Sequence, residues 1–246
     1  MEKLSVSGLV IKENHTGESD RVITILTKEY GLLRAFATGA RKIKSKTGAG
    51  TQLLCYSEFN IVKGRGTYRV TEALPVAVFF SLRADIERLT VAQYFCELAG
   101  VLVNEGENSG DMLRILLNSL SLMADGKRSA PMIKAITELR LLCEAGFQPD
   151  LIACCGCGCF EGKRFYFQPL AAQLYCAECK GNETGLMEIN LSVLSAMRHI
   201  CYAAIDKLYN FTLPESDIKS LGNVTERYLI AQTDHYFSTL NFYHTL

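Results

Sequence analysis

Four cysteines in the second half of the chain limit its possible folds more than any other feature of the sequence. Cys154 and Cys157 form one Cys-x2-Cys pair, Cys176 and Cys179 form a second, and eighteen residues separate the pairs. This spacing is typical of a zinc site with four thiolate ligands, in which each pair turns so that both sulfurs face the ion. Because four thiolates complete a tetrahedral shell, we expect a structural zinc ion and not a catalytic one.

The register of this zinc motif stays open on the residues alone. Cys155 and Cys159 lie in the same short segment as the first pair, and either could replace one of its members. A zinc deaminase is not indicated, because none of the four histidines begins the His-x-Glu triplet of that class. The thiol pattern is also similar to that of redox switches. A zinc-dependent thiol redox chaperone and a zinc-ribbon protein-interaction module are therefore alternative functions.

At 246 residues the chain is longer than a typical single domain. It lacks the basic and apolar segments of a signal peptide, and no run of eighteen or more uncharged apolar residues indicates a membrane span. We therefore expect two domains in a cytoplasmic protein without a membrane partner. The cytoplasm keeps thiols reduced, so the ten cysteines indicate metal binding and not a disulfide framework.

The spacing of apolar residues changes near residue 80. Before this point, short segments rich in β-branched and apolar residues alternate with turn residues, a pattern that suits a small closed barrel. After it, apolar residues recur at helical spacing. We expect an α+β multidomain protein, with an OB-fold β-barrel over residues 1–80 and an α-helical domain over residues 81–246 that carries the zinc motif at 150–182. The expected strands are 5–11, 21–27, 32–38, 55–62 and 67–73, and the expected helices are 82–106, 111–124, 131–145, 190–208 and 215–240.

Charge is distributed unevenly, although the chain as a whole is neutral. The first 82 residues hold twelve Lys and Arg against seven Asp and Glu, while the remainder holds fourteen against nineteen. The basic half is therefore where a polyanion would bind. Residues 39–48, here called the basic loop, crowd four cations between glycines. These cations, with one on the preceding expected strand, are Arg41, Lys42, Lys44, Lys46 and Arg34.

The last expected hairpin adds an aromatic ring and further cations to the basic half. A basic groove with stacking rings is how OB-folds hold single-stranded nucleic acid, whereas the basic loop does not match a Gly-x4-Gly-Lys nucleotide-binding loop. Nucleophile elbows, His-Glu-x2-His motifs and clustered carboxylates are missing too, so we expect a binding protein and not an enzyme. The residues of this hairpin are Lys63, Arg65, Tyr68 and Arg69.

Over its whole length the sequence resembles the RecO family of bacterial recombination mediators. In the zinc motif, the segment from Gly146 to Gly158 is similar to the family pattern, and this resemblance selects Cys154 and Cys157 over their neighbours. The N-terminal half carries the other matching segments. They are Glu18–Arg21, Thr27–Leu33, Ala37–Arg41 with Lys44–Ser45, and Lys63–Ala73.

The resemblance implies an OB-fold joined to a helical domain with a zinc motif, and no enzymatic turnover. Members of the family bind single- and double-stranded DNA, anneal complementary strands, and act with RecR and the single-strand DNA-binding protein to load recombinase during DNA repair. A protein with this role would be cytoplasmic and associated with the nucleoid. By the same resemblance the DNA-facing residues are Arg34, Arg41, Lys42, Lys44 and Lys46, with Arg21, Arg65 and Arg69 as further candidates. Tyr68 is the candidate stacking ring because of its place on the basic hairpin.

Overall fold

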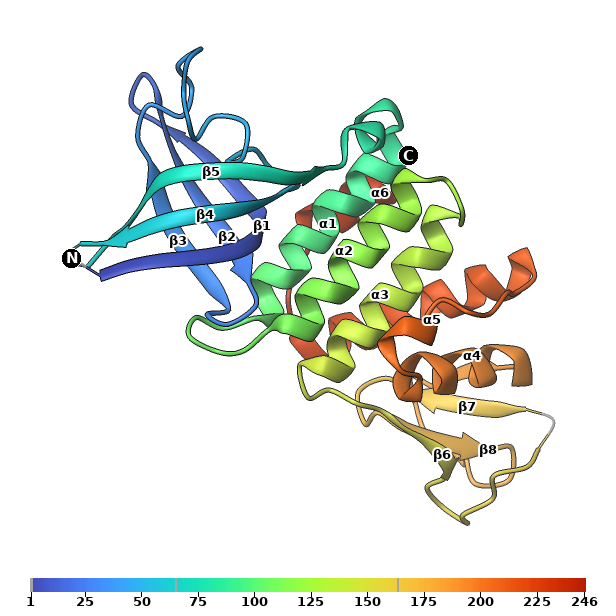
Figure 1. Cartoon of the computed structure of the whole chain (residues 1–246). Helices are drawn as coiled ribbons and strands as arrows, with labels where there is room; N and C mark the ends of the chain where they lie inside the picture. The colour runs from blue at the N-terminus through green and yellow to red at the C-terminus, as the bar shows by residue number, and fades with distance from the viewer. Residues whose placement is uncertain (1, 65, 163) are drawn as a thin grey trace. The chain divides into compact units, whose positions relative to one another are not determined.

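The computed structural model describes residues 2–64, 66–162 and 164–246 (Figure 1). By the packing of its backbone the chain divides into two compact units, which are Met1–Lys127 together with Phe237–Leu246, and Arg128–Tyr236. The first unit contains a β-barrel with its flanking helices, and the second contains the cysteine motif among further helices. The fold class predicted from the sequence, an OB-fold barrel followed by helices with a four-cysteine motif, is confirmed.

The strands of the first unit form a closed barrel in the order β1-β2-β3-β5-β4. Neighbouring strands run antiparallel except for β3 and β5, which pair in parallel over two positions, Ala35 with Tyr68 and Phe36 with Arg69. A five-stranded barrel of this kind is the OB-fold. Its strands are β1 (Glu2–Thr16), β2 (Asp20–Thr27), β3 (Leu32–Ala37), β4 (Cys55–Lys63) and β5 (Tyr68–Val78).

The barrel closes because alternate residues of its strands are apolar and meet in one core. On β2, Ile23 and Ile25 are 0% exposed, and on β4, Phe59 and Ile61 are 1% exposed. The residues between them point to the outer face, since successive side chains of a strand alternate in direction. This alternation is the reason that all five strands were correctly predicted, although β1 and β5 extend several residues further than expected.

The helices of the first unit contact the barrel directly. Helix α1 (Ile86–Leu102) and helix α2 (Gly110–Ala124) both pack against β1, so this unit extends past residue 80. The helix predicted from residue 82 begins instead at Ile86, because the Asp85 side chain accepts a hydrogen bond from the Arg88 amide at 3.1 Å and caps the helix. Residues Phe80–Ala84 form a separate 3-10 turn, η1.

The second unit corrects both of the last predicted helices. Helix α4 (Leu191–Tyr202) ends before residue 208, where the Arg140 guanidinium donates hydrogen bonds to the carbonyls of Ile200, Cys201 and Ala203. A basic side chain that satisfies the last carbonyls in this way stabilises the end of a helix. Helix α5 (Glu215–Thr233) ends before residue 240, because Asp234 adopts a left-handed conformation with φ of 45°. The other elements here are α3 (Ala130–Glu144), η2 (Ile205–Lys207) and the four strands of the cysteine motif.

The segment after α5 returns to the first unit as a short helix, α6 (Ser238–Tyr243). Glu97 of α1 holds its first turn. One carboxylate oxygen of Glu97 accepts from the amide and hydroxyl of Ser238, each at 3.1 Å, and the other accepts from the amide and hydroxyl of Thr239. Burial alone would raise the pKa of Glu97, but these four hydrogen bonds outweigh it and lower the pKa below its usual range.

We expect Glu97→Gln to lower the free energy of unfolding by about 1 kcal/mol at neutral pH, the usual cost of losing a helix cap. Because the folded pKa of Glu97 is lowered, its contribution is present above the unfolded pKa of about 4.3 and is lost as pH falls through the folded pKa. Urea unfolding of wild type and variant at pH 7 and pH 3 measures this. A difference in stability that is the same at both pH values would contradict it.

Candidate metal centre and nucleic-acid interface

The cysteine motif is a small four-stranded sheet with the order β6-β8-β7-β9. Cys154 is the last residue of β6 and Cys176 is the last residue of β8, and these two strands pair in parallel. Each pair's second cysteine, Cys157 or Cys179, lies in the turn that follows its strand. The sheet therefore brings the two turns together. Its strands are β6 (Asp150–Cys154), β7 (Phe165–Gln168), β8 (Gln173–Cys176) and β9 (Met187–Ile189).

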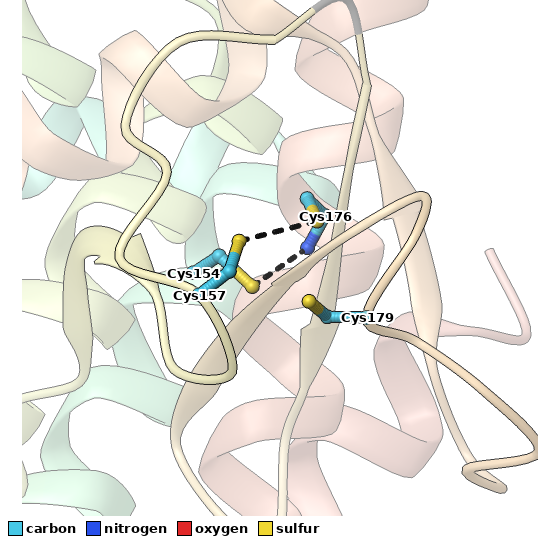
Figure 2. Close-up of side chains that lie close together, drawn as sticks. All are labelled: Cys154, Cys157, Cys176 and Cys179. Atoms are coloured by element: carbon cyan, nitrogen blue, oxygen red, sulfur yellow. Dashed lines mark hydrogen bonds between the residues drawn. The ribbon is translucent and has the colours of Figure 1, made fainter.

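The four sulfurs of Cys154, Cys157, Cys176 and Cys179 all lie within 4.8 Å of one another. Figure 2 shows these side chains pointing toward a common centre from two turns, with the Cys157 and Cys176 sulfurs 3.8 Å apart. Cys154 and Cys176 are buried, whereas Cys157 and Cys179 lie closer to the surface. One ion could therefore touch all four sulfurs at once.

The surroundings of Cys154 favour a thiolate. Burial would raise its pKa, but backbone hydrogen bonds from Cys176, Cys157 and Gly156 outweigh burial and lower the pKa to about 6. The Cys176 amide lies 3.2 Å from the Cys154 sulfur (Figure 2). Gly156 is required for this turn, since a Cβ there would lie 2.9 Å from the Cβ of Cys179. Thiolate ligands with backbone donors in tight turns fit a bound metal ion.

Crowding of the thiols has the opposite effect at Cys179. Hydrogen bonding to the sulfurs of Cys157 and Cys176 raises the pKa of Cys179, because these bonds favour its protonated form. A divalent cation would reverse that effect by neutralising the shared charge. A bound metal ion would therefore keep all four cysteines in the thiolate form.

The two extra cysteines lie outside the cluster. Cys155 is exposed, and its thiol lies beside the hydroxyl of Tyr175, whose pKa it raises. The Cys159 thiol donates instead to the carbonyl of Glu161 at 2.7 Å. In the described part of the chain, the four cysteines that could share an ion are the predicted ones, Cys154, Cys157, Cys176 and Cys179.

The basic loop lies between β3 and β4 and is fixed at several points. Its Arg41 amide donates to the carbonyl of Ser19 at 2.9 Å. Arg21 supports the loop from β2, because its guanidinium donates to the Gly48 carbonyl at 2.7 Å and pairs with Glu13 at 2.8 Å. The Arg21 side chain is only 12% exposed. This placement argues against Arg21 as a DNA-contacting residue and assigns it to positioning the loop.

The remaining predicted cations face solvent. Arg34 lies on the outer face of β3, and Arg69 lies on the outer face of β5. Tyr68 is half-buried, with the Lys63 ammonium 5.8 Å from the centre of its ring. Arg65 lies outside the described residues. The exposed set, which forms no ion pair within the described residues, is Arg34, Arg41, Lys42, Lys44, Lys46 and Arg69.

Sequence reasoning missed one residue beside this set. Phe36 lies on β3 between two completely buried alanines, Ala35 and Ala37, and is itself 39% exposed. The signal was present in the alternation of the strand, because Phe36 shares its face with Arg34 and not with the core residues. An aromatic ring thus lies on the outer face next to a cation.

None of the helices in the described part of the chain combines the length and apolar character needed to cross a membrane.

Two family models match this chain. The model described as recombination protein O N terminal matches residues 1–79, and the model described as recombination protein O C terminal matches residues 83–240. The chain is 36% identical over 246 residues to DNA repair protein RecO of Acetivibrio thermocellus, which covers 100% of this chain and 98% of the relative. The protein of the same name from Alkaliphilus metalliredigens is 29% identical over 231 residues, 94% of each chain.

Proposed function

The chain belongs to the recombination protein O family of DNA repair proteins, and from this premise we propose that it acts by holding DNA strands on the basic face of its barrel. The observation that carries the proposal is the group of exposed cations on the basic loop and on β3, next to an OB-fold barrel. Such a barrel commonly tracks a nucleic-acid backbone through a basic groove. The DNA-contacting set that we propose is Arg34, Arg41, Lys42, Lys44, Lys46 and Arg69, with Tyr68 as a stacking ring.

Binding of this kind depends mainly on counterion release. Each lysine or arginine that neutralises a phosphate frees condensed counterions, so affinity is largely independent of sequence and falls steeply as salt rises. Two strands held on one basic surface repel each other less, while weak contacts still allow them to rearrange until bases pair. We therefore propose that the protein binds both single- and double-stranded DNA and anneals complementary strands.

The family resemblance also supplies the partners. We propose that the protein acts with RecR and with the single-strand DNA-binding protein, and that it helps to load recombinase onto coated strands at the nucleoid in the cytoplasm. Because the helical half of the chain carries the excess of acidic residues, it is better suited to protein partners than to DNA. The protein would turn over no small substrate in this role.

The metal that we propose for the cysteine cluster is zinc, held by Cys154, Cys157, Cys176 and Cys179. Zinc bound by four thiolates has no open position for water or substrate, so it would stabilise the fold of the motif without taking part in a reaction. Membership of a DNA repair family favours this structural role over the two alternatives, a thiol redox chaperone and a zinc-ribbon interaction module.

Strand annealing tests the proposal directly. Two complementary fluorescent oligonucleotides, mixed with and without the protein, should form a duplex faster with it, and the acceleration should fall as salt rises. A non-complementary partner strand is the control. Binding of both strands without any acceleration would contradict the annealing role alone, whereas a failure to bind either strand would contradict the whole proposal.

A further inference from the structure

A groove of about 570 Å³ opens on the first unit beside the short parallel pairing of β3 and β5. It exists because β3 and β5 pair at only two positions, so the first residues of β3 have no strand partner on that side. The turn after α1 borders the other side, where Gly31 and Glu105 form a β-bridge. The side chains that matter for its chemistry are Arg34, Phe36, Tyr68 and Glu105.

Two aromatic rings border this groove from adjacent strands. Phe36 on β3 is 39% exposed, and Tyr68 at the start of β5 is half-buried against the barrel core. On the outer face of β3, the neighbours of the Phe36 ring along the strand are Arg34 and Thr38, so the ring is not packed into the barrel core. The ring is therefore available to a flat apolar partner, which can stack on it.

The charges around the rings fit a nucleic-acid strand. Arg34 lies on the groove itself, and Arg69 is the pairing partner of Phe36 in the parallel register, so it projects on the same outer face. Glu105 at the other border disfavours a phosphate there, but a carboxylate can accept hydrogen bonds from the amino groups of a base. Bases and phosphates therefore have separate places around the groove.

We propose that this groove receives unpaired nucleobases of a bound DNA strand, with Phe36 as the stacking platform and Tyr68 as a second ring. The inference rests on the proposed function, because it assigns the bases of a strand whose phosphates lie on the basic loop. A base inside a duplex is already stacked and paired, so it is not available to these rings. The groove would therefore set a preference for single strands over duplexes.

Phe36→Leu tests this proposal because it removes the ring and keeps an apolar side chain on the surface. We expect single-stranded DNA to bind roughly tenfold more weakly, the usual effect of losing one stacked base, and duplex DNA to bind as in wild type. The salt slope should not change, since no phosphate contact is lost. Phe80→Leu is the matched control, because Phe80 is an exposed phenylalanine of the same unit, outside the groove.

Phe36→Trp gives an independent readout, because the sequence contains no tryptophan. The new indole should retain the affinity of wild type, and its fluorescence should be quenched by single-stranded DNA but not by duplex. Phe80→Trp should show no such quenching. An unchanged affinity of Phe36→Leu, or an equal loss on both kinds of DNA, would overturn the groove proposal while wild-type binding stands. Failure of wild type to bind any DNA would instead overturn the proposed function.

Discussion

Cys157→Ser is expected to reduce bound zinc from one ion per chain to almost none and to lower the thermal midpoint by roughly 10 °C. A serine hydroxyl is not ionised at neutral pH and cannot replace the thiolate. Structural zinc contributes about 10 kcal/mol or more to the folding of small zinc-finger peptides, and part of that loss would fall on the sheet β6 to β9. Metal analysis and thermal unfolding of the purified chain measure both effects.

Cys155→Ser is the matched control for that substitution. Both side chains are exposed and lie in the same turn, but only Cys157 has its sulfur in the cluster. We expect Cys155→Ser to retain one zinc ion and the thermal midpoint of wild type. Loss of zinc from Cys155→Ser, with retention by Cys157→Ser, would show that the register of the ligands is wrong.

The other large effect is expected from the basic loop. Replacement of Arg41, Lys42, Lys44 and Lys46 by alanine should weaken binding of single-stranded DNA several hundredfold at 0.1 M salt and reduce the salt slope by about three. Both values follow from the release of about 0.7 counterion per neutralised phosphate on a single strand. Because all four side chains are exposed, the free energy of unfolding should change little.

A second variant with the same change in net charge separates this local effect from a global one. Its substitutions remove four exposed cations that are not part of the basic loop. If affinity depends on the position of the cations, this variant should keep the salt slope of wild type. Equal weakening by the two variants would show that net charge alone controls binding. The control substitutions are Lys127→Ala, Lys207→Ala, Lys219→Ala and Arg227→Ala.

Sequence patterns predicted those elements whose structure is determined by residues close to one another in the chain. The barrel strands could be predicted because residues such as Ile23 and Ile25 alternate with outward-facing ones. The spacing of the cysteines predicted the cluster itself, whereas the choice of Cys154 and Cys157 over Cys155 and Cys159 needed the family resemblance. For the strands and for the cysteine spacing, the determining contacts are local or repeat with the period of the element.

Contacts between distant residues could not be predicted in this way. Arg140, which lies on α3, binds the last carbonyls of α4, and one of these, Ile200, is 60 residues away in the sequence. Arg21 resembles the other cations in sequence, but its side chain is only 12% exposed, pairs with Glu13 and donates to the Gly48 carbonyl of the basic loop. The groove at Phe36 depends on a parallel pairing of β3 with β5, which no turn or spacing in the sequence specifies.

The most direct test of DNA binding is a titration of fluorescent single-stranded DNA with the wild-type protein across a salt series. We expect measurable affinity at low salt and a linear fall of log K with log salt, with a slope of about −3 or steeper. Affinity that is absent at low salt, or that does not depend on salt, would contradict a role in which the basic loop holds the phosphates of a DNA strand.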